Sequence, residues 1–159
     1  MDIITQILKR TNFLSPKNDK SELPIHLSCE MGLYEISLIL LKKMSNLNMK
    51  DQMGLTVLNK AINSEYKNRD LIMYLMKNGA DINSDDINGE NVLMNGIRQS
   101  KNDSNLQSIL DFEWEFKPQI VIIAVQRGSL IILEKILKKI EKKEWNRNEA
   151  LDIAIRKSK

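Results

Sequence analysis

The sequence predicts an all-α solenoid of about four helix-turn-helix units with a half-unit at each end. The main observation is a recurring pattern: Asp51 begins a turn followed by two helical stretches, and Asp86 begins the same arrangement 35 residues later. A fixed period of roughly 20–50 residues is the signature of stacked repeats that share one core. Within each unit, apolar residues also recur every three or four positions, as they do on one face of a helix.

The first complete unit is predicted at residues 18–50. Pro24 suits the first turn of a helix, because its φ is fixed and it lacks an N–H group. Gly32 ends this helix, and a second amphipathic helix follows. Lys42 and Lys43 fall in its last turn, where positive charge complements the helix dipole. The small or apolar residues assigned to the two helices are Ile25, Leu27, Ser28, Cys29, Leu33, Ile36, Ile39 and Leu40.

The second and third units, residues 51–85 and 86–116, repeat this order of elements. Gly79 ends the second helix of the second unit. The connection between the two helices is predicted to be lengthened in both units, over residues 64–69 and 100–105. The core residues predicted for these units are Leu58, Ala61, Ile62, Leu71, Ile72, Leu75, Met76, Leu93, Ile97, Leu106, Ile109 and Leu110.

The fourth unit, residues 117–147, lacks the leading turn of the others. Phe112, Trp114, Phe116 and Pro118 occupy that place. We expect a shortened segment whose aromatic side chains fill the gap, although their alternation with acidic residues also suits an exposed edge. The core predicted for this unit consists of Ile120, Ile123, Ala124, Val125, Leu130, Leu133, Ile136 and Leu137.

Half-units are predicted at both ends, over residues 1–17 and 148–159, so residues 1–159 form a single domain. Stacked repeats leave an apolar face at each end, and terminal repeats normally cover it with polar residues. The polar residues assigned to this task are Asp2, Gln6, Lys9, Arg10, Asp152, Arg156, Lys157 and Lys159.

The composition predicts a soluble globular protein. Of the 159 residues, 42% are hydrophobic and 28% are charged, which excludes a disordered chain. One cysteine cannot form an internal disulfide, so a reducing compartment is expected: the cytoplasm, with the nucleus left open. No apolar run is long enough to span a bilayer and no signal peptide is recognised. The net charge of +3 is too small to indicate nucleic acid by itself.

No catalytic, metal or cofactor site is predicted. His26 is the only histidine, and with Cys29 it cannot complete a tetrahedral zinc site. The six glycines lie in turns or at helix ends, not in a phosphate-binding loop, apart from Gly96. Gly96 falls inside a predicted helix, where it indicates tight helix packing. Asp85 and Asp86 lie at a turn tip without a predicted pocket.

Two stretches of the chain resemble the ankyrin-repeat family. Residues 23–32 resemble its motif Thr-Pro-Leu-His-x-Ala-Ala-x-x-Gly and keep Pro24, His26 and Gly32. Residues 75–83, Leu-Met-Lys-Asn-Gly-Ala-Asp-Ile-Asn, resemble the ending of its second helix. The period of 35 residues is also close to the roughly 33 residues of one ankyrin repeat.

The chain departs from the family in one respect. His26 follows Leu23 in the place of the usual threonine, whereas Thr56 precedes Asn59 in the place of the usual histidine. The sequence therefore does not predict the Thr–His hydrogen bonds usual in the family, and modest stability is expected. For His26, its place in the motif favours a structural, hydrogen-bonded role over that of a metal ligand or a base.

The resemblance implies non-catalytic protein recognition by a monomer, as adaptor or as stoichiometric inhibitor. In ankyrin stacks, partners usually contact the turn tips and the exposed side of the first helices. Apolar residues at such positions favour an interface, and methionine adapts to irregular partners. The alternative is that they pack between neighbouring turns. The candidate partner-binding residues are Met31, Gln52, Met53, Leu55, Asn63, Ile87, Asn88, Glu90, Arg98, Gln99, Gln126 and Arg127.

Two further hypotheses concern the partner. The short length, degenerate motifs and abundant Lys, Asn and Ile resemble small ankyrin proteins of viruses or intracellular pathogens, some of which are similar to inhibitors of NF-κB. The first alternative is therefore an IκB-like protein that sequesters a host NF-κB/Rel factor. The lesser alternative is nucleic-acid binding, because clustered basic residues neutralise phosphates, although a solvated helix face is commoner. The basic residues in question are Lys135, Lys138, Lys139, Lys142, Lys143, Arg147, Arg156, Lys157 and Lys159.

Overall fold

The computed structural model of the chain describes residues 17–142. The predicted terminal half-units lie outside the described residues, apart from Lys17. The helices of the described part are α2 (Pro24–Glu30), α3 (Tyr34–Leu41), α4 (Val57–Asn63), α5 (Arg69–Lys77), α6 (Val92–Gln99), α7 (Asp103–Leu110), α8 (Gln119–Arg127) and α9 (Leu130–Lys142).

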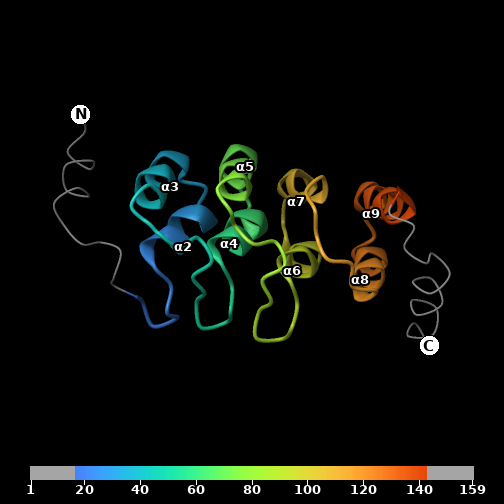
Figure 1. Ribbon diagram of the computed structural model, residues 1–159, viewed down its shortest axis with the longest axis horizontal. Coiled ribbons are helices and arrows are strands. Elements are labelled where there is room, and N and C mark those ends of the chain that lie inside the picture. The colour runs from blue at the N-terminus through green and yellow to red at the C-terminus, as the bar shows by residue number, and fades with distance from the viewer. Residues whose placement is uncertain (1–16, 143–159) are drawn as a thin grey trace.

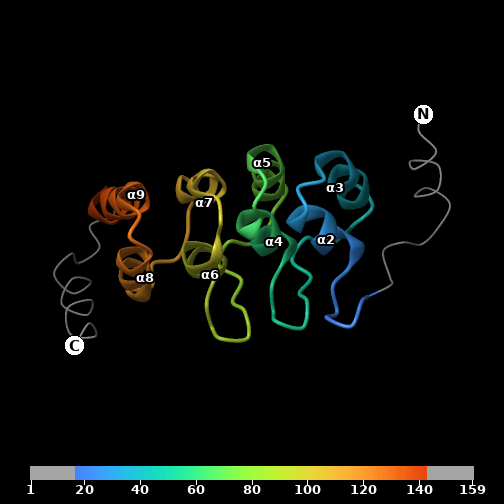
Figure 2. The same cartoon turned by 180° about the vertical axis from the view of Figure 1, so that it is seen from behind.

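The helices form two parallel rows, seen from opposite sides in Figures 1 and 2. One row contains α2, α4, α6 and α8, and the other contains α3, α5, α7 and α9. Each helix of the first row packs against the next one along the row and against the second row. Long turns, which we call fingers, project from the first row between successive units (Figure 1). The prediction of an all-α repeat solenoid is confirmed.

One hydrogen-bonding pattern shapes all three fingers. The first residue of each finger turn is Asn18, Asp51 or Asp86, and its Oδ1 accepts hydrogen bonds from the N–H groups two and four residues later. Its own N–H donates to the carbonyl group four residues later. Asn and Asp favour such turns because their short side chains reach the backbone that follows. The period seen in the sequence is therefore the period of these turns.

Neighbouring fingers are joined through their backbones. The N–H of Gln52 donates to the carbonyl of Lys20 at 3.0 Å, and the N–H of Ile87 donates to the carbonyl of Met53 at 3.1 Å. Gly54, with φ +76°, lies against the third finger so closely that a Cβ there would be 2.8 Å from the nitrogen of Ile87. Glycine is required here both for its left-handed φ and for this close approach.

The first helices begin with hydrogen bonds that replace the missing Thr–His pairs. In the first unit, Nδ1 of His26 accepts from the N–H of Leu23 at 3.1 Å, and Nε2 of His26 lies 3.2 Å from the carbonyl oxygen of Met49. In the second unit, Oδ1 of Asn59 accepts from both the N–H and the hydroxyl of Thr56 at 2.9 Å. The expected structural role of His26 is confirmed, and asparagine supplies the same contact to the start of α4.

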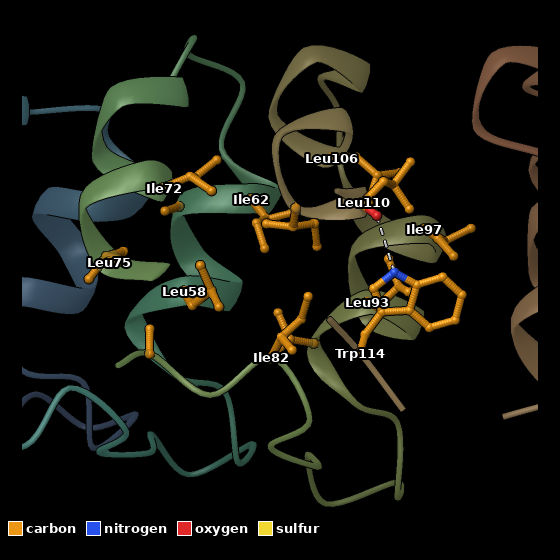
Figure 3. Packing of buried hydrophobic residues seen from close by; sticks show 14 of the residues in the cluster. Leu58, Ile62, Ile72, Leu75, Ile82, Leu93, Ile97, Leu106, Leu110 and Trp114 are labelled. Carbon is orange, nitrogen blue, oxygen red and sulfur yellow. Dashed lines mark hydrogen bonds between the residues drawn. The ribbon is translucent and has the colours of Figure 1, made fainter. Parts of the chain in front are cut away.

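One hydrophobic core runs between the two rows of helices and into the bases of the fingers. The core residues predicted for the second and third units are buried, and Met76 packs against them with partial exposure. Gly96 of α6 lies where a Cβ would be 3.0 Å from Cγ2 of Ile62, which confirms the predicted close packing. The residues labelled in Figure 3 are Leu58, Ile62, Ile72, Leu75, Ile82, Leu93, Ile97, Leu106, Leu110 and Trp114.

The prediction was wrong about which side chains face the core in the outer units. Val125 is 57% exposed and Leu130 is 73% exposed, whereas Ile132, Ile136 and Ile140 carry the buried stripe of α9. These isoleucines are spaced by four residues and so share one helix face. The start of α9 is apolar at four successive positions, so spacing alone could not identify this face. Leu27 and Leu33 of the first unit are also exposed rather than buried.

The connection predicted over residues 100–105 is shorter than expected. Helix α7 already begins at Asp103, because Oδ1 of Asn102 accepts from the N–H of Ser104 at 3.0 Å and caps the helix. In the second unit, the connection ends at Asn68, and α5 begins at Arg69.

The fourth finger is absent, as predicted. Residues 111–118 join α7 directly to α8, whereas fingers of residues 42–56 and 78–91 separate the earlier units. Trp114 is 3% exposed, and its Nε1 donates to the carbonyl of Leu110 at 3.3 Å (Figure 3). Phe116 also packs against the core. These two aromatic side chains therefore fill the place of the finger, and the exposed-edge alternative is wrong.

Alanine at Gly54 is expected to destabilise the fold more than alanine at Gly89. Both glycines have a left-handed φ, which costs another residue about 1–2 kcal/mol. Only the methyl group at residue 54 would overlap a neighbouring finger, since a Cβ at Gly89 meets nothing within 4 Å. We expect the free energy of unfolding to fall by about 1–3 kcal/mol more for Gly54→Ala, as measured by urea denaturation. Equal losses in the two variants would contradict tight packing between the fingers.

The imidazole of His26 is expected to titrate below pH 6.5. Burial lowers the pKa of His26, and this effect outweighs the Met49 carbonyl and the Asp51 charge, which raise it. As the pH falls, His26 is therefore protonated near pH 6.5 in the unfolded chain but only at lower pH in the folded chain. The free energy of unfolding consequently decreases as the pH drops below about 6.5. Because the chain has a single histidine, NMR titration of its ring protons measures this pKa directly. A midpoint at or above 6.5 would contradict the burial.

Candidate functional site

A groove of about 690 Å³ lies between the first two fingers, α2, α4 and the connection that follows α4. It is larger than two other hollows, of about 260 and 290 Å³, that lie beside α7 and α9. Three large side chains of its lining are exposed: Met31 is 56% exposed, Met53 is 45% exposed and Tyr66 is 60% exposed. Leu27 and Leu55 complete the apolar lining.

Lys60 of α4 lies at the centre of a charged cluster in this groove. Its Nζ is 2.5 Å from Oε1 of Glu22, 3.2 Å from Oδ2 of Asp51 and 3.7 Å from Oε2 of Glu30. The side chains of Glu22 and Asp51 are almost fully buried, whereas that of Glu30 is half exposed. The cluster therefore ties the first two fingers to the end of α2 and to α4.

The protonation of this cluster follows from its contacts. Burial alone would raise the pKa of Glu22, but hydrogen bonds from Lys60 and Asn18 outweigh it and hold that pKa below its usual value. Burial alone would lower the pKa of Lys60, but its bonds to Glu22 and Asp51 outweigh it and raise that pKa. Each shift favours the charged form, so Glu22 and Lys60 form an ion pair at neutral pH.

Buried amides and a hydroxyl hold the backbone around Tyr66. Asn105 is fully buried, and its Nδ2 donates to the carbonyl of Tyr66 at 2.7 Å. The hydroxyl of Ser64 donates to the carbonyl of Glu30 at 2.6 Å, and Nδ2 of Asn68 donates to the carbonyl of Cys29 at 2.9 Å. Tyr66 therefore stands on a fixed backbone with its ring in solvent. Tyr66 was not predicted as a site residue, although it lies in the connection that was predicted to be lengthened.

The candidate residues fall into two groups. Five of them line the groove: Met31, Gln52, Met53, Leu55 and Asn63. The others lie beyond it on the third finger and on the first-row helices: Ile87, Asn88, Glu90, Arg98, Gln99, Gln126 and Arg127.

Within the second group, Ile87 is 62% exposed, and Asn88, Gln99 and Gln126 are also exposed. Arg98 forms a forked ion pair with Glu90: Nη2 and Nε of Arg98 lie 2.8 and 3.0 Å from Oε1 of Glu90. The pair joins α6 to the third finger.

The comparison with protein families agrees with this architecture. A family model described as ankyrin repeats (3 copies) matches residues 1–86, more than half of the chain. The chain belongs to the ankyrin-repeat family. No curated protein sequence matches it significantly. Ankyrin repeats generally mediate protein–protein interaction and are typically non-catalytic.

Arg127 is placed differently from the other candidates of this ankyrin stack. Its Nη1 donates to the carbonyl of Ile97 at 2.7 Å, its Nη2 donates to the carbonyl of Ser100 at 2.9 Å, and it also pairs with Asp103. Because of these contacts, the guanidinium group lies at the junction between the third and fourth units. We therefore leave Arg127 out of the proposed binding surface.

The basic C-terminal end of the ankyrin stack is only partly described. Lys139 donates to the carbonyl groups of Leu110 and Phe112 and lies over the ring of Trp114, so it serves the fold. Lys138 and Lys142 are exposed, and Lys135 is half-buried. The remaining basic residues, Lys143, Arg147, Arg156, Lys157 and Lys159, lie outside the described residues.

The described part of the chain contains no group of three His, Cys, Asp or Glu residues that could hold a metal ion. Both ring nitrogens of His26 are engaged. Cys29 is buried, and this burial raises the pKa of its thiol to about 12, which keeps it protonated at neutral pH. Over residues 17–142, no helix is long and apolar enough to cross a membrane.

Replacing Lys60 by Met is expected to lower the free energy of unfolding at pH 7 by about 2–4 kcal/mol. The change leaves Glu22 and Asp51 as buried carboxylates without their cation, and the loss stays below that of a fully enclosed pair because Lys60 touches water. Urea denaturation at several pH values measures it. Lys101→Met, which removes the exposed partner of Glu65, is the matched control and should change the free energy of unfolding little.

The loss in free energy of unfolding caused by Lys60→Met should become smaller in acid. In the natural chain the pKa of Glu22 is lowered on folding, so its stabilising effect is present above pH 4.5 and is lost as the pH falls through the folded pKa. Without Lys60, burial favours the protonated carboxyl group of Glu22, so the variant loses less stability than the natural chain as the pH falls. A deficit that stays constant from pH 7 to pH 3.5 would contradict the role of the ion pair.

Proposed function

We propose that this ankyrin domain binds a partner protein through the groove and the finger tips, as adaptor or as stoichiometric inhibitor. The observation that carries the proposal is the exposure of large apolar side chains on a fixed backbone. Met53 and Ile87 project from fingers that are hydrogen-bonded to each other, and Met31 and Tyr66 flank the groove. Contiguous exposed apolar surface of this kind is typical of protein interfaces.

A fixed backbone favours tight binding, because few conformations are lost when the partner docks. Each finger is closed by its own turn hydrogen bonds, and the connection around Tyr66 is held by Asn105 and Ser64. The affinity then depends on the apolar contacts. Tyrosine and methionine suit this role, since both are enriched in interface cores.

The IκB-like hypothesis gives one specific partner, a host Rel-family factor. It rests on the resemblance of the sequence to small pathogen ankyrin proteins, and no contact within residues 17–142 singles out such a partner. Affinity capture from host-cell lysate with the full chain tests it: a Rel protein should be in the eluate, and its absence removes the hypothesis.

Nucleic-acid binding through the basic end is the lesser alternative. Lys139 is engaged in the fold, which removes one of the described lysines from a phosphate-binding face. A fluorescence titration with nucleic acid at low and moderate salt tests the rest, since phosphate contacts weaken steeply with salt. No binding at low salt would remove this alternative.

The double variant Met53→Asp/Ile87→Asp tests the main proposal. We expect the affinity for a partner, identified by capture and mass spectrometry, to fall at least about tenfold, because a charge replaces two exposed apolar contacts. The thermal unfolding midpoint should stay nearly unchanged, since neither side chain is buried in the core. Unfolding of the double variant would instead place these residues in the core.

The matched control is Leu130→Asp/Ile131→Asp. These two residues are also exposed and apolar, and they lie at the start of α9, away from the groove. The control makes the same change in charge and should bind the partner with unchanged affinity. Equal loss of partner in both double variants would refute the groove and finger tips as the binding surface.

A further inference from the structure

We propose that the groove recognises a partner segment in which an arginine or lysine stands beside a large apolar residue. In this arrangement, the partner's cation pairs with Glu30 and lies against the ring of Tyr66, and its apolar side chain enters between Met31 and Met53. This inference rests on the proposed function, since it names the chemistry of the segment that the same groove would bind.

The charges around Lys60 do not balance. Three carboxylates, those of Glu22, Glu30 and Asp51, surround this single ammonium group within 4 Å. The cluster therefore keeps an excess of negative charge, although the chain as a whole has a net charge of +3. A second cation is favoured there, because it approaches carboxylates that one ammonium group only partly compensates.

Only one of these carboxylates is within reach of a partner. The side chains of Glu22 and Asp51 are 5% and 2% exposed, whereas that of Glu30 is 53% exposed. Glu30 also has the longest contact to Lys60, at 3.7 Å, so a partner can engage it without breaking a short ion pair. The structure thus assigns Glu30 as the anchor for the partner's cation.

The other charges of the groove do not cancel this excess. Glu65 and Lys101 pair with each other at one end. Lys20, on the first finger, is the remaining cation among the lining residues, and the acidic lining residues still outnumber the basic ones. An acidic peptide or a phosphate would therefore meet net repulsion in this groove.

Apolar side chains line the groove beside Glu30. Met31 follows Glu30 in the chain, and Leu27, Met53 and Leu55 line the same groove. Methionine side chains adapt to partners of irregular shape, so the lining fits a large aliphatic or aromatic residue. An apolar residue next to a basic one satisfies both the carboxylate and this lining.

Tyr66 adds a preference for arginine. Its ring is exposed at the groove, and its backbone is held by Ser64 and Asn105. An arginine side chain stacks its planar guanidinium on an aromatic ring while it donates two hydrogen bonds to a carboxylate, which lysine cannot do. The groove is therefore expected to favour arginine over lysine.

A displayed library of random twelve-residue peptides, selected on the full chain, tests the proposal. Three forms are compared: the natural chain, Glu30→Lys, and the control Glu35→Lys. Glu35 is an exposed carboxylate of α3 outside the groove lining, so the control makes the same change in net charge. We expect the natural chain and the control to select peptides rich in Arg or Lys beside Leu, Ile, Met or Phe. On Glu30→Lys this enrichment should fall at least tenfold.

A selected peptide then allows affinity measurement by fluorescence anisotropy. Tyr66→Ala should raise Kd about five- to tenfold, whereas Tyr34→Ala, which removes a half-exposed ring of α3, should not change it. An equal effect of the two tyrosine variants would overturn the role assigned to Tyr66.

Failure of this inference is distinguishable from failure of the proposed function. Peptides without a basic residue that still require Met53 and Ile87 would overturn the inference and leave the groove as a binding surface. Basic peptides that bind Glu30→Lys as well as the natural chain would also overturn it. If the natural chain selects no peptide, the inference is refuted, whereas the proposed function depends on the separate capture of a partner.

Discussion

Hydrogen bonds from buried side chains to the backbone of the preceding repeat hold this stack together. Asn68 donates to the carbonyl of Cys29, and Asn105 donates to the carbonyl of Ala61, so each reaches the last turn of an earlier first-row helix. Such carbonyls have no partner within their own helix and are costly to bury unpaired. In the fourth unit, Arg127 takes over this role toward Ile97. Different side chains thus meet one constraint at every junction.

The same bonds give the groove its shape. Because Asn105 and Ser64 fix the chain after α4, Tyr66 lies against Gly32, just beyond α2, and stays largely exposed. The charged cluster of Lys60 acts at the other side, where it holds two fingers against α4. The apolar side chains between these two anchors are thereby displayed instead of being gathered into the core.

Local chemistry explains which features were predictable. The turn residues Asp51 and Asp86 act on backbone two and four residues away, so the repeat and its period could be read directly from the sequence. The position of Tyr66 depends on Asn105, which is far along the chain. The buried face of α9 was missed because its first four residues are all apolar. The contacts of Arg127 were not predicted because they lie in another unit.

Because the fourth finger is missing, the tip of the third finger is left uncovered on one side. Gly54 and Gly89 hold equivalent places in their turns, yet only Gly54 is covered by the finger that follows. The open side at Gly89 is therefore an unused docking surface for one more finger. Grafting residues 78–91 in place of residues 111–118 would add one finger to the row. The short connection over residues 111–118 thus limits the length of partner that the row of fingers can contact. Replacing this connection offers a way to engineer that length.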